Sequence, residues 1–87
     1  DALRQDLADQ LAPYPAECRA GFVLISGYAD DLDRGVELAR RAYDLLVEAF
    51  PAMFPPETGN QPFWQPAEGQ DVGQVQLEIF FYNGCPV

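Results

Sequence analysis

The chain has 87 residues, of which 48% are hydrophobic and 13% aromatic, so it is long enough for one small domain and too apolar for a disordered segment. Its formal net charge is −9, because fourteen acidic residues face five basic ones, all arginine. This balance disfavours nucleic-acid and anionic-membrane partners, which require a basic surface. The absence of histidine excludes Ser-His and Cys-His catalytic pairs. No apolar run is long enough to span a membrane, and no secretory leader is visible.

Hydrophobic periodicity predicts a helix over 2–12, a strand over 21–28 and a long helix over 31–50. The first helix follows from leucines four residues apart, and the apolar strand segment GFVLISGY is typical of a strand that lies inside the sheet or is covered on both faces. We expect Asp1 and Asp30 to act as the N-caps of the two helices. The stripe of the long helix that we expect to be buried consists of Leu32, Val36, Ala39, Tyr43, Leu46, Val47 and Phe50.

Residues 51–71 contain five prolines and two glycines, a composition that predicts a long loop. Its large side chains, Met53, Phe54, Phe63 and Trp64, either cover the core or form an exposed binding surface. Alternation over 72–82 then predicts a half-buried strand, and Asn83-Gly84 is a turn signal. We therefore expect a single α+β domain over 1–87, in the order α-β-α-β. Two strands make a weak sheet, so a further strand within 13–20 or 51–71, or another subunit, is expected to complete it.

Two groups of residues in the sequence could carry chemistry. The string Tyr28-Ala29-Asp30-Asp31 matches the metal-binding YADD of reverse-transcriptase palm domains, but it lies between a strand and a helix, where helix capping explains both aspartates. Asp33 adds a third oxygen donor, yet carboxylates at a helix start point apart. We therefore expect no catalytic, cofactor or metal site. Cys18 and Cys85 bracket the two strands; a disulfide requires antiparallel strands, and two reduced thiols are favoured.

The terminal strand places Phe80 and Tyr82 on the face that should contact solvent. Phe63 and Trp64 of the preceding loop belong to the residue types favoured at the centres of interfaces. The sequence therefore predicts a protein interface formed by Phe63, Trp64, Phe80 and Tyr82. We expect its partners to be other protein subunits, in a homo-oligomer or a larger assembly.

The order of elements, from the helix DALRQDLADQL to the terminal strand GQVQLEIFFYN, resembles the tail-terminator or tail-completion proteins of long-tailed phages. That resemblance implies a small α+β subunit that closes the tail tube, located in the cytoplasm during assembly and then in the virion. Those proteins usually have two more strands after the first helix, where this chain has only residues 13–20.

Three functions remain open at this point. The first is a non-enzymatic structural or assembly protein that acts through protein–protein contacts. An acidic inhibitor that mimics nucleic acid and binds a basic protein groove is the alternative that the charge suggests. A carboxylate- or metal-dependent enzyme is the remote alternative, because carboxylates are the main reactive groups of the chain.

Overall fold

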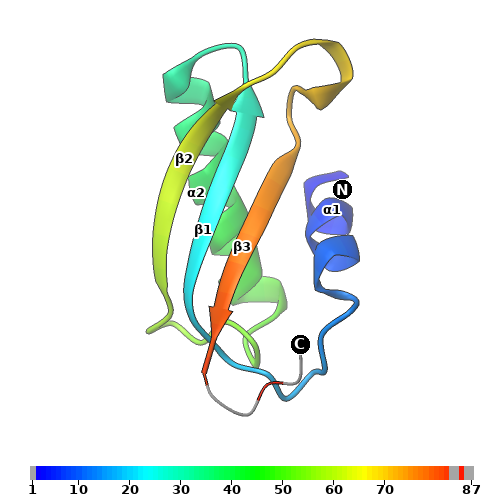
Figure 1. Ribbon diagram of the computed structural model, residues 1–87, viewed down its shortest axis with the longest axis vertical. Helices are drawn as coiled ribbons and strands as arrows, with labels where there is room; N and C mark the ends of the chain where they lie inside the picture. Colours follow the sequence, from blue (N-terminus) through cyan, green and yellow to red (C-terminus); the bar gives the residue numbers. More distant parts are fainter. Residues whose placement is uncertain (1, 83–84, 86–87) are drawn as a thin grey trace.

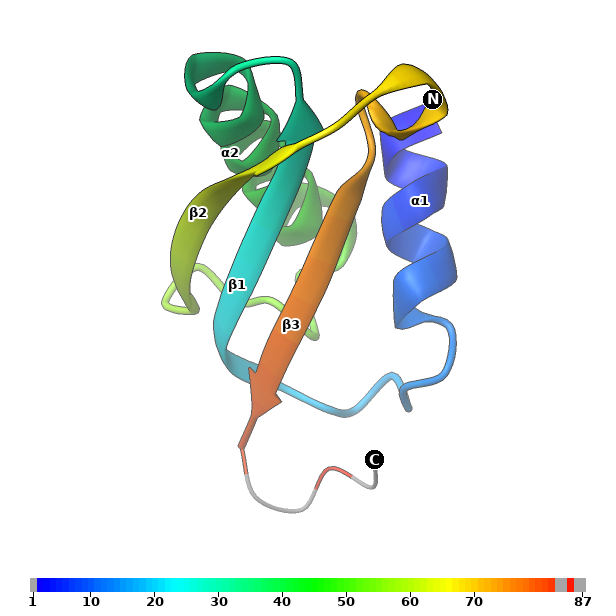
Figure 2. The same ribbon diagram turned by 45° about the horizontal axis from the view of Figure 1, so that its top comes forward.

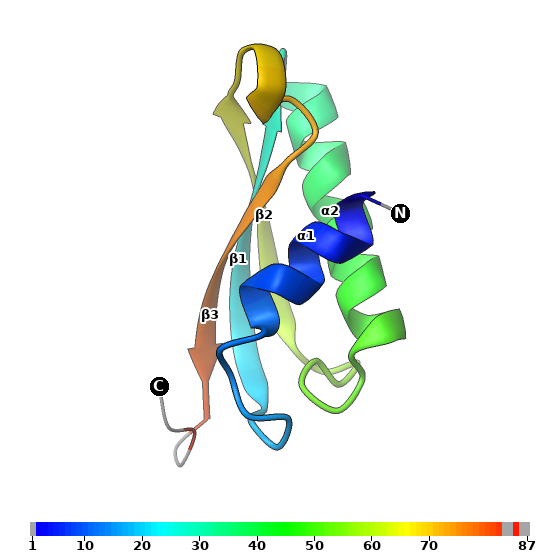
Figure 3. The same cartoon turned by 90° about the vertical axis from the view of Figure 1, so that its right-hand side faces the viewer.

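The computed structural model describes residues 2–82 and 85. Three strands form one sheet in the order β2-β1-β3, in which β1 is parallel to β2 and antiparallel to β3 (Figure 1). Helices α1 and α2 lie on the same side of this sheet (Figure 3), and no helix of the described residues covers its other side. The expected α+β class is confirmed. The elements are α1 (Ala2–Leu11), β1 (Ala20–Ala29), α2 (Leu32–Ala49), β2 (Gly59–Pro66), the short 3-10 helix η1 (Gly69–Asp71) and β3 (Val75–Phe81).

Strand β2 is the expected further strand, and it lies within the segment predicted as a loop. Pro62 and Pro66 disfavour the prediction of a strand when only the sequence is known. They are tolerated here because β2 is an edge strand, where the missing N–H groups interrupt no ladder. Helix α2 connects β1 to β2 as the crossover that two parallel strands require. The three-stranded sheet therefore forms within one chain.

Helix α2 begins one residue later than predicted. Asp31 is its N-cap: the Asp31 carboxylate accepts a hydrogen bond of 2.9 Å from the backbone N–H of Arg34, which satisfies one of the free donors of the first turn. The prediction that Asp30 caps this helix is therefore wrong. Asp1, the expected cap of α1, lies outside the described residues.

The buried side of α2 agrees only in part with the predicted stripe. The buried positions of this helix are Gly35, Ala39, Ala42 and Leu46, of which Ala39 and Leu46 belong to the stripe. Leu32, expected at the start of the stripe, is 56% exposed. The small residues decide this orientation, because the helix approaches the sheet more closely on the side that carries glycine and alanine.

The leucine stripe predicted for α1 is confirmed, because Leu3, Leu7 and Leu11 are buried. Helix α1 also covers the outer edge of β3 (Figure 2). The Gln10 side chain donates to the Val75 oxygen at 2.8 Å and accepts from the Leu77 N–H at 2.9 Å. The Asp6 carboxylate accepts from the Val75 N–H at 3.1 Å. Side chains of a helix thus occupy the place of a fourth strand, which protects this stretch of the sheet edge.

The segment between α2 and β2 closes one end of the core. Phe54 is fully buried and Met53 is nearly so, so these two large side chains cover the core instead of forming an exposed surface. The buried Thr58 hydroxyl donates to the Ala20 oxygen at 3.0 Å, and the Tyr43 hydroxyl donates to the Thr58 oxygen at 2.7 Å. These bonds fix the start of β2 beside the start of β1.

Cys18 and Cys85 form a disulfide with their Cα atoms 5.1 Å apart. Cys18 precedes β1 and Cys85 follows β3; because these strands are antiparallel, the two residues meet at the same end of the sheet. The expectation of two reduced thiols is wrong. The sequence did not reveal the direction of the strands, which decides whether the cysteines can meet.

Candidate protein-binding surface

The side of the sheet opposite the helices, which we call the open sheet face, carries aromatic side chains from all three strands. Side chains alternate between the two faces of a strand, and the register places Phe22 beside Phe80 and Ser26 beside Phe63. The most exposed aromatic residues of this face are Phe22 (37%), Phe63 (42%), Phe80 (49%) and Tyr82 (59%). The face consists of Phe22, Leu24, Ser26, Tyr28, Gly59, Gln61, Phe63, Gln65, Gln76, Glu78 and Phe80, with Tyr82 directly after β3.

The aromatic rings at one end of the open sheet face pack on their neighbours within the sheet. The ring centroids of Phe22 and Phe80 are 6.4 Å apart, in a tilted arrangement that is typical of favourable aromatic pairs. The Phe22 ring also lies over Gly59 of β2: a Cβ at that position would be 2.7 Å from the ring. A glycine at this position therefore leaves room for the ring against the neighbouring strand.

A shallow hollow of about 340 Å³ lies at the centre of the same face. Ser26, a small residue, forms part of its floor, and the Phe63 ring stands to one side. The Gln76 side chain is oriented by a 2.9 Å hydrogen bond that its oxygen accepts from the Tyr28 hydroxyl. Glu78 lines the hollow and is the only charged residue in the three strands. The hollow is lined by Leu24, Ser26, Phe63, Gln65, Gln76 and Glu78.

Three of the four predicted interface residues share the open sheet face, and Trp64 does not. Because Phe63 and Trp64 are consecutive in β2, their side chains point to opposite sides of the sheet. The Trp64 indole N–H donates to the Ala29 oxygen at 3.0 Å, and its ring lies against Gly35 of α2. Trp64 is thus part of the contact between helix and sheet.

Sequence reasoning omitted residues of β1 from the interface. Phe22, Leu24 and Tyr28 share one face of the predicted strand by simple alternation, but a strand that is apolar on both faces does not indicate which face contacts a partner. These residues are identified as part of the open sheet face by the register of β1 with β3, which brings Phe22 beside Phe80. That register depends on the tertiary structure.

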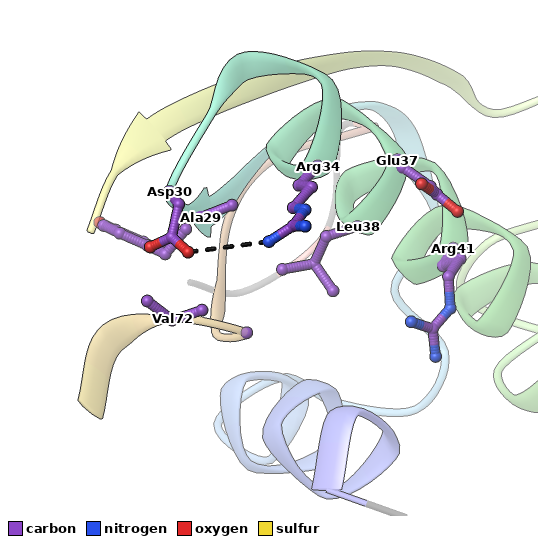
Figure 4. A pocket seen from close by; sticks show the side chains of 9 residues that line it. Ala29, Asp30, Arg34, Glu37, Leu38, Arg41 and Val72 are labelled. Carbon is purple, nitrogen blue, oxygen red and sulfur yellow. Dashed lines mark ion pairs between the residues drawn. The ribbon is translucent and has the colours of Figure 1, made fainter. Parts of the chain in front are cut away.

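A second concave region, of about 260 Å³, lies between the start of α2 and the turn before β3 (Figure 4). Arg34 extends toward Asp30, with 3.8 Å between the charged groups, and its Nε lies 3.7 Å from the Asp31 carboxylate. The side chains of Arg34 and Asp30 are 72% and 63% exposed, so this cleft is solvated and internally paired. Glu37 and Arg41 add one charge of each sign to its wall.

The aspartates that were considered as metal ligands have other roles. Asp31 caps α2, and Asp30 pairs with Arg34. Within residues 2–82 and 85, no three acidic, cysteine or histidine side chains converge on a point where a cation could bind. The helices of this part of the chain are also too short or too polar to cross a membrane.

Comparisons with protein-family models, curated proteins and solved structures find no significant match to this chain. The resemblance to phage tail-terminator proteins therefore stays a prediction.

Proposed function

We propose that this protein is a non-enzymatic assembly protein that binds another protein through its open sheet face. The observation that carries the proposal is the uncovered sheet with four aromatic side chains at least 37% exposed. The pair of Phe22 and Phe80 stabilises the sheet but leaves much of both rings exposed, and aromatic residues are enriched at the centres of interfaces. The three strands also contain a single charged residue, and depletion of charge is the other mark of such centres.

The alternatives have less support. A mimic of nucleic acid needs carboxylates in rows on one face, whereas those of this chain are spread over both helices, the loops and the sheet. One of them, Asp6, is engaged with the edge of β3. An enzyme needs converging reactive groups, and the cleft of Figure 4 offers exposed, mutually paired charges.

The disulfide favours a protein that functions in an oxidising environment. Disulfides persist outside cells, in oxidising compartments and on the surfaces of particles, and are rare in the reducing cytosol. A subunit of a virion, as the phage resemblance implies, fits this condition. A mature protein located in a reducing cytoplasm does not fit this condition.

The test is selection of random peptides, displayed on phage, against the immobilised disulfide-bonded protein. We expect selected peptides to bind the wild type and to lose binding to a Phe63→Ser/Phe80→Ser variant. The matched control is Leu32→Ser, which removes an apolar side chain that is 56% exposed on the helical side and should leave binding intact. Peptides that bind the sheet variant as well as the wild type, or no peptides at all, contradict the proposal. Sedimentation velocity of the same proteins measures self-association, the other form of assembly that the sequence predicts.

A further inference from the structure

The open sheet face has one charged group, and its position suggests the chemistry of the partner. We infer that the hollow over Ser26 receives a basic side chain, preferably arginine, from the bound protein. This inference rests on the proposed function, because it names the partner chemistry of the same face.

The first support is the location of Glu78. It lies beside Leu24 in the register of β1 and β3, halfway along β3, and it lines the hollow of the open sheet face. A carboxylate in a hollow that a bound partner covers loses water, and this loss is costly unless a cation replaces the water. A partner that covers the face therefore needs a positive group opposite Glu78.

The second support is the aromatic ring that lines the hollow together with the carboxylate. Phe63 lies beside Ser26 on β2, and Glu78 lies beside Leu24 on β3, so the two side chains are diagonal to each other across β1. The two strands that flank β1 are about 10 Å apart, so an arginine side chain placed over Ser26 lies between them. A guanidinium binds a carboxylate with two parallel hydrogen bonds and stacks on aromatic rings. The amides of Gln65 and Gln76 supply further polar contacts.

The third support is the charge of the whole molecule. At −9, the protein attracts basic partners and repels acidic ones at long range. A second copy stacked on the same face would bring two such charges together and would leave Glu78 without a cation. The open sheet face is therefore better matched to a basic partner than to itself.

The test uses the peptides selected against the wild type. We expect arginine or lysine to be enriched at one fixed position, next to apolar residues. The same selection against Glu78→Gln, which keeps the size of the side chain, should lose this enrichment. Against Glu78→Lys, the enriched residue should become aspartate or glutamate. For a peptide selected on the wild type, Glu78→Gln should weaken binding about tenfold, a typical effect of losing a charged hydrogen bond.

A matched control separates the carboxylate from general charge. Glu37→Gln removes one negative charge from the exposed side of α2 and should change the affinity by less than about twofold, as expected for a screened, distant charge. Peptides that need Phe63 and Phe80 but show no basic preference overturn this inference and leave the proposed function standing. A basic preference that survives Glu78→Gln also overturns it. Failure to select any peptide dependent on the open sheet face overturns both.

Discussion

Gly27 of β1 and Gly35 of α2 lie against each other with no space for a side chain on either residue. A Cβ on Gly27 would collide with the backbone oxygen of Gly35, and a Cβ on Gly35 would lie 2.8 Å from the Gly27 oxygen. The Trp64 ring packs on the same side of Gly35. This contact sets how closely α2 approaches the sheet, and it explains why the helix buries its small residues.

Gly35→Ala should destabilise the protein by about 1–3 kcal/mol, the usual cost of overpacking a core. The sign is informative, because alanine in place of glycine within a helix otherwise favours folding by about 1 kcal/mol. Urea denaturation measures the difference. Arg40→Ala, on the exposed side of α2, is the control and should change the free energy of unfolding by less than about 0.5 kcal/mol. A Gly35→Ala protein as stable as the wild type would contradict the close packing.

The neighbours Phe63 and Trp64 should respond differently to truncation. Trp64→Ala removes a half-buried ring between helix and sheet together with its hydrogen bond to Ala29, and should cost about 2–4 kcal/mol. Phe63→Ala, on the open sheet face, should cost less than about 1 kcal/mol. Thermal melts of the two variants compare these values. Equal losses would mean that both rings belong to the core, and the open sheet face would then lose its central aromatic residue as a binding group.

The orientation of α2 predicts a second contrast between two residues of the stripe expected from the sequence. Leu46 is fully buried and Leu32 is 56% exposed. Leu46→Ala should lower the free energy of unfolding by about 2–4 kcal/mol, since it removes buried methyl groups and leaves a cavity. Leu32→Ala should change it by less than about 0.5 kcal/mol. Similar losses from the two substitutions, measured by urea denaturation, would show that the helix is rotated from the orientation described above.

Helix α1 protects the edge of β3 through Gln10, which bonds to both Val75 and Leu77. Gln10→Ala should destabilise the protein by about 1–3 kcal/mol, because two backbone groups lose their partner. Hydrogen exchange should show faster exchange of the Leu77 amide. The matched control is Gln5→Ala on the same helix, where the exposed side chain bonds to Asp9 and the Leu77 amide should keep its protection. Unchanged exchange in Gln10→Ala would rule out this role of α1.

Reduction of the disulfide should cost about 4 kcal/mol, the loop-closure value for two cysteines that are 67 residues apart in the sequence. Cys18→Ala/Cys85→Ala should behave as the reduced protein does. Urea denaturation with and without dithiothreitol measures the effect in the wild type, and the double variant should be insensitive to the reductant. A wild-type midpoint that does not move on reduction would mean that the bridge contributes nothing to stability.

Local patterns in the sequence were sufficient for four of the five main elements. The leucines of α1, the apolar run of β1, the periodicity of α2 and the alternation of β3 each reflect burial on one or both sides of a single element. Strand β2 was missed because prolines and glycines in its segment predict a loop, and only its position at the sheet edge makes them acceptable. In a strand, consecutive side chains point to opposite faces, so β2 places Phe63 and Trp64 on opposite sides of the sheet. A segment predicted as a loop does not show this.

The sequence by itself determined the α+β class, the strong negative charge, the lack of histidine chemistry and the outward direction of Phe80 and Tyr82, since these depend on composition or on the period of one element. Only the tertiary structure decided the disulfide, the buried side of α2 and the membership of the open sheet face. Each of these depends on which strands are neighbours and in which direction they run. Strand order and direction arise from contacts between residues far apart in the chain, such as Phe22 with Phe80 and Gly27 with Gly35, and no local pattern records them.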